Sequence, residues 1–140
     1  MATKKSFAYV SMSRSELDTW KKYKQHKAVA LVKRGYSVEW YPDANAWIKV
    51  YVPQRDDAGT PELCASVKCH MTPAVGGIRG GRITKLSIER SRSNLDHLVG
   101  DAPEDGTEVL FHYDRGPDVD RLRRDKVAQK LYKTVLEELN

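Results

Sequence analysis

The sequence predicts an α+β domain with a mainly antiparallel sheet of about five strands, one helix before the sheet and one after it. Two amphipathic helical patterns lie near the ends of the chain, and short alternating segments lie between them. Consecutive short strands with no intervening helix favour antiparallel pairing. We therefore expect one or both helices to cover one face of the sheet. The length of 140 residues fits a single domain, 1–140.

The first helix is expected to follow Ser13 and to end near Arg34. Ser13 and Glu16 match a capping box, in which each side chain bonds the other residue's backbone N–H. Gly35 is the kind of residue that commonly ends a helix. Steps of three and four residues define its expected buried stripe: Leu17, Trp20, Tyr23 or Lys24, Ala28, Leu31 and Val32.

Five segments between the helices alternate apolar and polar residues, with turn residues or glycines between them. The expected strands are 36–40, 46–52, 63–71, 82–90 and 108–113. We expect residues 92–107 to form a long loop and residues 1–12 a flexible arm. Cys64 and Cys69 are five residues apart on one expected strand, so they face opposite sides and should not form a disulfide.

A second helix is expected to follow Gly116-Pro117, with Asp118 or Asp120 as its cap, and to run to the end of the chain. One apolar face predicts its buried side: Val119, Leu122, Val127, Leu131, Val135 and Leu139.

The net charge of +5 is unevenly distributed. Residues 1–35 hold nine basic and two acidic residues, whereas the remainder holds fifteen basic and seventeen acidic residues. The expected surface of the first helix, with Lys21, Lys24 and Lys27, would attract nucleic acid or an acidic protein surface. The alternative is that these lysines only solvate the helix. No apolar run approaches the length of a membrane span, and the first residues do not read as a secretory signal, so we expect a cytoplasmic protein.

The segment from Gly76 to Lys85 is the most unusual in the chain, with four glycines and the basic residues Arg79, Arg82 and Lys85. Backbone N–H groups in a glycine-rich turn can form an anion-binding concavity, and basic side chains can supplement it. The phosphate loops of nucleotide-binding proteins lead into a helix, whereas this segment leads into an expected strand. The alternative is a tight turn whose glycines adopt positive φ.

Two further features could contribute to a binding site. Asp114 and Arg115 follow the fifth expected strand and could serve a site at the end of the sheet, or form an internal ion pair. Trp47 and Tyr51 share a strand face with Lys49, so they are candidates for stacking on bases. The alternative for both aromatic residues is packing or a protein interface.

No catalytic pattern is evident. The four histidines lack the spacing of a metal site, and Cys64 and Cys69 lack the second ligand pair of a zinc site. No serine-hydrolase elbow is present. A Cys–His nucleophile formed in space stays open. We therefore expect a binding protein with no metal and no cofactor rather than an enzyme.

Two motifs carry a family resemblance: GIRGGRITKL at 77–86 and YDRGPD at 113–118. With the terminal helix they resemble a family of small uncharacterised proteins of bacteriophages and prophages, over about residues 67–139. Pro117 stands where that family usually has Trp. The resemblance implies a phage or mobile-element protein in the cytoplasm of a bacterial host. It also implies that the glycine loop and the Tyr-Asp-Arg-Gly turn form one structural unit and adjoin.

The leading hypothesis is a small basic accessory protein that binds a host protein or nucleoprotein complex and inhibits a nucleic-acid-based defence factor, as an anti-CRISPR does. This hypothesis combines the implied phage context with the basic charge. The second hypothesis is direct binding of nucleic acid. The third is sequestration of a nucleotide signal, with Arg79, Arg82 and Arg115 on the phosphates. No membrane partner is expected.

Overall fold

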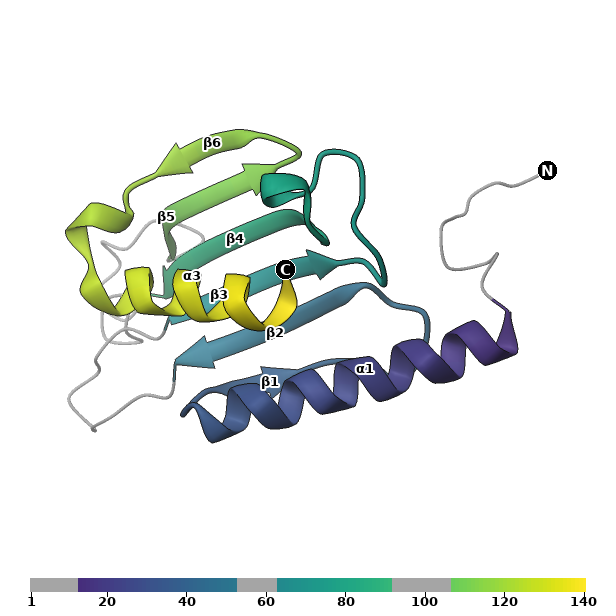
Figure 1. Cartoon of the computed structure of the whole chain (residues 1–140). Coiled ribbons are helices and arrows are strands. Elements are labelled where there is room, and N and C mark those ends of the chain that lie inside the picture. The colour runs from purple at the N-terminus through teal and green to yellow at the C-terminus, as the bar shows by residue number, and fades with distance from the viewer. Residues whose placement is uncertain (1–12, 53–62, 92–106) are drawn as a thin grey trace.

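The computed structural model describes residues 13–52, 63–91 and 107–140. These residues form two long helices and six strands (Figure 1). In chain order they are α1 (Arg14–Lys33), β1 (Ser37–Glu39), β2 (Trp47–Val52), β3 (Leu63–Cys69), β4 (Ile83–Ser91), β5 (Thr107–Asp114), β6 (Pro117–Asp120) and α3 (Lys126–Leu139). The 3₁₀ turns η3 (Ile78–Gly80) and η4 (Leu122–Arg124) precede β4 and α3. The expected arm 1–12 and residues 92–106 of the expected loop lie outside the described residues.

The six strands form one antiparallel sheet in which each strand pairs with its neighbours in the sequence. Both helices lie on the same face of this sheet, α1 beside β1 and α3 across the central strands (Figure 1). The predicted α+β class is confirmed. Covering one face alone explains the alternation along β3, where buried and half-buried residues follow one another without exception. No helix in the described ranges is long and apolar enough to cross a membrane.

The sixth strand is a correction to the prediction. Residues 117–120 were expected to begin the last helix, but they pair with β5 and form the edge of the sheet. Pro117 has no N–H to donate, which suits the first position of an edge strand. The last helix begins at Lys126, where the Asp125 side chain accepts a hydrogen bond from the Ala128 N–H at 3.0 Å. The predicted caps Asp118 and Asp120 are therefore wrong.

The predicted start and end of the first helix are confirmed. The Ser13 N–H donates to Glu16 Oε1 at 3.0 Å, and the Glu16 N–H donates to Ser13 Oγ at 3.2 Å. Gly35 follows the last turn with a φ of 97°, a backbone conformation that glycine adopts without strain. Of the predicted buried stripe, Trp20, Ala28 and Leu31 are buried, whereas Val32 is 57% exposed.

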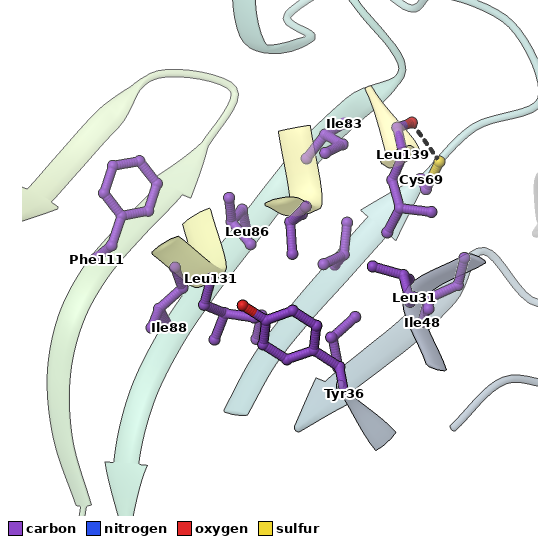
Figure 2. Packing of buried hydrophobic residues seen from close by; sticks show 14 of the residues in the cluster. Leu31, Tyr36, Ile48, Cys69, Ile83, Leu86, Ile88, Phe111, Leu131 and Leu139 are labelled. Carbon is purple, nitrogen blue, oxygen red and sulfur yellow. Dashed lines mark hydrogen bonds between the residues drawn. The ribbon is translucent and has the colours of Figure 1, made fainter. Parts of the chain in front are cut away.

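The core lies between the sheet and the two helices. Figure 2 shows Leu31 of α1 together with Leu131 and Leu139 of α3 against the inward residues of the strands. The buried Cys69 thiol donates a hydrogen bond to the Leu139 carbonyl oxygen at 3.2 Å (Figure 2). Cys64 lies on the opposite face of β3, and the two cysteines form no disulfide, as predicted.

Lys24 is the one charged side chain buried within the described residues, with only 1% of its surface exposed. Its ammonium lies 5.1 Å from the centroid of the Trp20 ring and 5.9 Å from that of Trp40. It donates to three backbone oxygens of the segment between β1 and β2: those of Tyr41, Asp43 (2.6 Å) and Asn45 (3.0 Å). Desolvation lowers the pKa of Lys24. This burial removes Lys24 from the predicted partner-binding surface.

Replacing Lys24 with methionine is expected to lower the free energy of unfolding by about 2–4 kcal/mol, because three partly buried carbonyl oxygens lose a charged donor. Chemical denaturation followed by circular dichroism measures the loss. Lys21→Met, on the exposed side of the same helix, is the control and should stay within about 0.5 kcal/mol of the wild type. Equal stability of the two variants would contradict the role given to Lys24.

Candidate functional site

The face of the sheet opposite the helices carries a mixed aromatic and basic row. Strand pairing places four side chains in line on adjacent strands: Trp47 (β2), Lys68 (β3), Lys85 (β4) and Asp114 (β5). Neighbouring strands lie about 4.8 Å apart, so successive members of the row are close together. All four side chains are exposed or half-buried. The row is therefore accessible.

Two more basic residues lie near this row, at the end of the sheet where β3 leads into the glycine loop. His70 follows β3, and Arg115 lies in the turn between β5 and β6. Burial lowers the pKa of His70, and the positive charges of Lys68 and Arg115 lower it further. Both cations are therefore close to the imidazole. We call Lys68, His70, Lys85 and Arg115 the sheet-end basic cluster.

The cluster is held in place by the neighbouring strand. His70 Nε2 lies 2.8 Å from Thr84 Oγ1, and the His70 N–H donates to the backbone oxygen of Arg82 at 2.9 Å. The Lys85 ammonium lies 3.8 Å from Asp114 Oδ2, at the long end of an ion pair and with both groups partly exposed. Such a pair contributes little to stability. An incoming anion can therefore compete with Asp114 for Lys85.

The glycine loop and the turn after β5 adjoin, as the resemblance implies. The Tyr113 hydroxyl donates to the Gly76 carbonyl oxygen at 2.8 Å. A β-carbon added to Gly76 would lie 3.2 Å from the β-carbon of Arg115. The Arg115 N–H in turn donates to the Thr84 carbonyl oxygen at 2.9 Å. These contacts bring Arg115 to the β4 end of the cluster.

The backbone of the glycine loop is a self-bonded turn. Gly77, Gly80 and Gly81 donate their N–H groups to carbonyl oxygens three residues earlier, at 2.8–2.9 Å. A β-carbon on Gly77 would lie 2.0 Å from the Gly81 oxygen, so only glycine fits there. These three N–H groups are occupied and cannot also cradle an anion. The geometry favours the tight-turn interpretation of the loop backbone.

Asn140 fastens the same loop to the end of α3. Its side-chain oxygen accepts the Ile83 N–H at 3.0 Å, and its amide nitrogen donates to the Ile78 oxygen at 3.0 Å. A β-carbon on Gly81 would lie 2.4 Å from Asn140 Oδ1. A larger residue at 81 would have to displace the Asn140 side chain, which ties the loop to the helix layer.

The three basic side chains of the predicted glycine-loop site do not converge. Arg79 is exposed in η3 with a φ of 52°. The Arg82 guanidinium lies 4.6 Å from the centroid of the Tyr23 ring, on the helix-covered side of the sheet. Lys85 lies on the opposite face, in the open row. The predicted trio is therefore divided, and only Lys85 belongs to the sheet-end basic cluster.

The predicted helix lysines are also divided. Lys21 is exposed on α1. Lys27 lies 5.7 Å from the centroid of the Tyr23 ring and 3.8 Å from Glu138 Oε1 of α3, so it links the two helices. With Lys24 buried, Lys21 alone of the three keeps an unobstructed surface position.

The two candidate stacking residues differ in their surroundings. Trp47 is 37% exposed and stands next to Lys68 in the row. Tyr51 lies farther along β2, and its hydroxyl donates to Glu39 Oε1 at 3.0 Å. Burial and that carboxylate raise the pKa of Tyr51 to about 12. Trp47 is the aromatic residue that accompanies the cluster.

Lys68 and His70 were missed by the sequence reasoning. Both alternate with the inward residues of the expected strand 63–71, so their outward position was readable from the sequence. The sequence does not give the register of the strands, and only this register places Lys68 beside Trp47 and Lys85.

Cys69 does not offer a nucleophile to this site. Burial raises its pKa to about 11, so the thiol is protonated at neutral pH. Its side chain points into the core, whereas His70 belongs to the open face. Across residues 13–52, 63–91 and 107–140, no three His, Cys, Asp or Glu side chains are grouped as a metal site requires.

A family model described as "Domain of unknown function (DUF7678)" matches residues 57–140, a range that contains the glycine loop and the turn after β5. The chain belongs to this family. The matched range begins after β2, so α1, β1 and β2, with Trp47, lie outside it. No curated protein and no solved structure matches the chain.

Gly77→Ala is expected to lower the free energy of unfolding by about 2 kcal/mol or more, because the new methyl group collides with the Gly81 carbonyl and the turn must open. Thermal and chemical denaturation measure the change. Gly116→Ala is the control, since no atom lies within 4 Å of its added β-carbon. A Gly77 variant as stable as the Gly116 variant would show that the loop is not tightly built.

The free energy of unfolding is expected to fall as the pH is lowered from about 7 to 5, partly through His70. Its folded pKa lies below the unfolded value of about 6.5, so the unfolded chain takes up the proton first and stability is lost on acidification. Urea denaturation at several pH values measures this loss. His70→Gln should make the dependence shallower, whereas His26→Gln on the exposed side of α1 should keep it. Identical pH profiles for wild type and His70→Gln would refute the assignment.

Proposed function

We propose that this protein acts by binding single-stranded nucleic acid on the open face of its sheet, at the sheet-end basic cluster with Trp47. The observation that carries the proposal is the row in which Trp47, Lys68 and Lys85 follow one another on adjacent strands. Single-strand binders combine basic groups that track phosphates with aromatic rings on which bases stack. Both components are present here within one row.

The distribution of charge supports nucleic-acid binding at the same end of the sheet. The row and its surroundings hold Lys68, Lys85 and Arg115, with Asp114 as the carboxylate in the row and Asp118 beside it, bonded to His112. Toward the other end of the face, Glu89 accepts from Ser87. Glu39 accepts from Tyr51 and pairs with Lys49, in the row next to that of Trp47. A phosphate backbone is therefore favoured at the loop end and opposed at the other end.

The nucleotide-sequestering arrangement of Arg79, Arg82 and Arg115 finds less support. Arg82 stacks on Tyr23 beneath the sheet, whereas Arg115 lies beside the cluster on the open side. These side chains cannot hold one phosphate chain without breaking the contact between Arg82 and Tyr23.

The wider setting that we propose is a phage or mobile-element protein in the cytoplasm of a bacterial host. There it would inhibit a nucleic-acid-based defence factor by binding nucleic acid that the factor holds. The resemblance to phage proteins and the basic cluster support this setting. Reconstitution of such a factor with its guide or substrate strand is the corresponding assay, and inhibition should disappear with the variants described next.

Lys68→Ala/Lys85→Ala should weaken binding of a labelled oligonucleotide of about 16 nucleotides and make its salt dependence shallower. Loss of two phosphate contacts should reduce the slope of log K against log salt concentration by about 1.4. Fluorescence anisotropy of oligo-dT and oligo-rU over a salt series measures both effects. Trp47→Ala should lower affinity about tenfold with the slope unchanged, because it removes stacking and no charge.

The matched control is Lys21→Ala/Lys22→Ala, which removes the same charge from the exposed side of α1. It should bind as the wild type does. No binding by the wild type at low salt would refute the proposal. Equal weakening by the two double variants would mean that α1 binds the oligonucleotide, or that binding depends only on the net charge of the protein.

A further inference from the structure

A cavity lies at the opposite end of the molecule from the sheet-end basic cluster. It has a volume of about 410 Å³ and lies where the end of α1, the end of β2 and the start of α3 meet. Trp47 and Val52 mark the two ends of β2, about 17 Å apart at strand spacing. The cavity also lies on the helix side of the sheet, so it is separate from the open row. Its volume is in the range of small-molecule sites.

The walls of this cavity carry two lysines without an acidic partner. Lys126 and Lys130 lie one helical turn apart at the start of α3, and neither forms an ion pair within the described ranges. Nearby carboxylates are already engaged: Glu137 and Glu138 bond Arg34 at 2.8 and 3.2 Å, and Asp125 pairs with Arg90. Among the described residues, the two lysines therefore have no carboxylate that neutralises them.

The remaining lining is largely apolar. Tyr36 is buried in the core beneath the cavity, and Val52 is half-buried at its side. Val127 is 48% exposed, whereas most apolar residues of α3 are buried. Arg34 is held in the wall by its two carboxylates. An apolar lining beside two lysines suits a ligand with one flat apolar part and one anionic part.

We propose that this cavity binds a small nucleotide, with its phosphates on Lys126 and Lys130 and its base against Tyr36 and Val127. Lysines one turn apart on a helix can both reach one phosphate chain, and charge-assisted hydrogen bonds are the strong ones. The base covers Val127 and takes apolar surface out of water. This inference does not depend on nucleic-acid binding by the open face.

Isothermal titration of the full chain with ATP, GTP, CTP and UTP tests the site, with pyrophosphate and adenosine as separate arms. At least one triphosphate should bind at one per chain, and more tightly than pyrophosphate or adenosine. Lys126→Ala/Lys130→Ala should weaken that binding about tenfold or more. Lys133→Ala/Lys22→Ala, which removes the same charge from exposed positions outside the cavity, should bind as the wild type does.

The sheet-end variant Lys68→Ala/Lys85→Ala separates the two proposals, because it should keep nucleotide binding while losing oligonucleotide binding. Loss of nucleotide binding in that variant, with retention in Lys126→Ala/Lys130→Ala, would overturn the cavity assignment. No binding of any triphosphate at millimolar concentration would also overturn it. Pyrophosphate binding as tight as that of the best triphosphate would overturn the role given to the apolar lining.

Discussion

In a sheet that is covered on one face, apolar and polar residues have to alternate along each strand. This constraint explains where most side chains of the molecule lie. Residues that point toward α1 and α3, such as Val67 and Leu86, are buried in the core. Most polar and charged residues of the same strands lie on the other face. Arg90 is an exception, since it pairs with Leu63 and reaches Asp125 on the helix side. Because neighbouring strands pair in register, Lys68 and Lys85 become neighbours although seventeen positions separate them in the sequence. The basic row is thus a product of the same alternation that builds the core.

The positive charge of this chain is partly used by the fold itself. Lys24 binds the carbonyl oxygens of the segment between β1 and β2, Arg82 stacks on Tyr23, and Arg34 joins the two helices through Glu137 and Glu138. Aromatic rings and carbonyl oxygens can hold a cation that is withdrawn from water. Net charge along the sequence is therefore a poor guide to basic surface, and the basic character of residues 1–35 overstates what α1 offers a partner.

The end of the sheet that carries the basic cluster is also firmly fastened. Asn140 holds the glycine loop from the α3 side, and Tyr113 holds it from β5. Gly77 has to be glycine for steric reasons, since a β-carbon would meet the Gly81 oxygen, and a β-carbon at 81 would displace the Asn140 side chain. The loop thus acts on the site indirectly, by positioning Arg115 beside His70. A cluster built on paired strands and a tight turn loses little conformational entropy when a ligand binds.

The fold class, the capping box of α1, the alternation of the central strands and the separation of the two cysteines could all be predicted from the amino-acid sequence. These features follow from patterns within about ten residues, where backbone geometry dictates which side chains share a face. The strand Pro117–Asp120 could not be predicted in this way, because its partner β5 supplies the hydrogen bonds. The same holds for the burial of Lys24, the divergence of Arg82 and Lys85, and the meeting of Trp47, Lys68 and Lys85. Register and burial are set by segments distant in the chain, whose pairing no local pattern encodes.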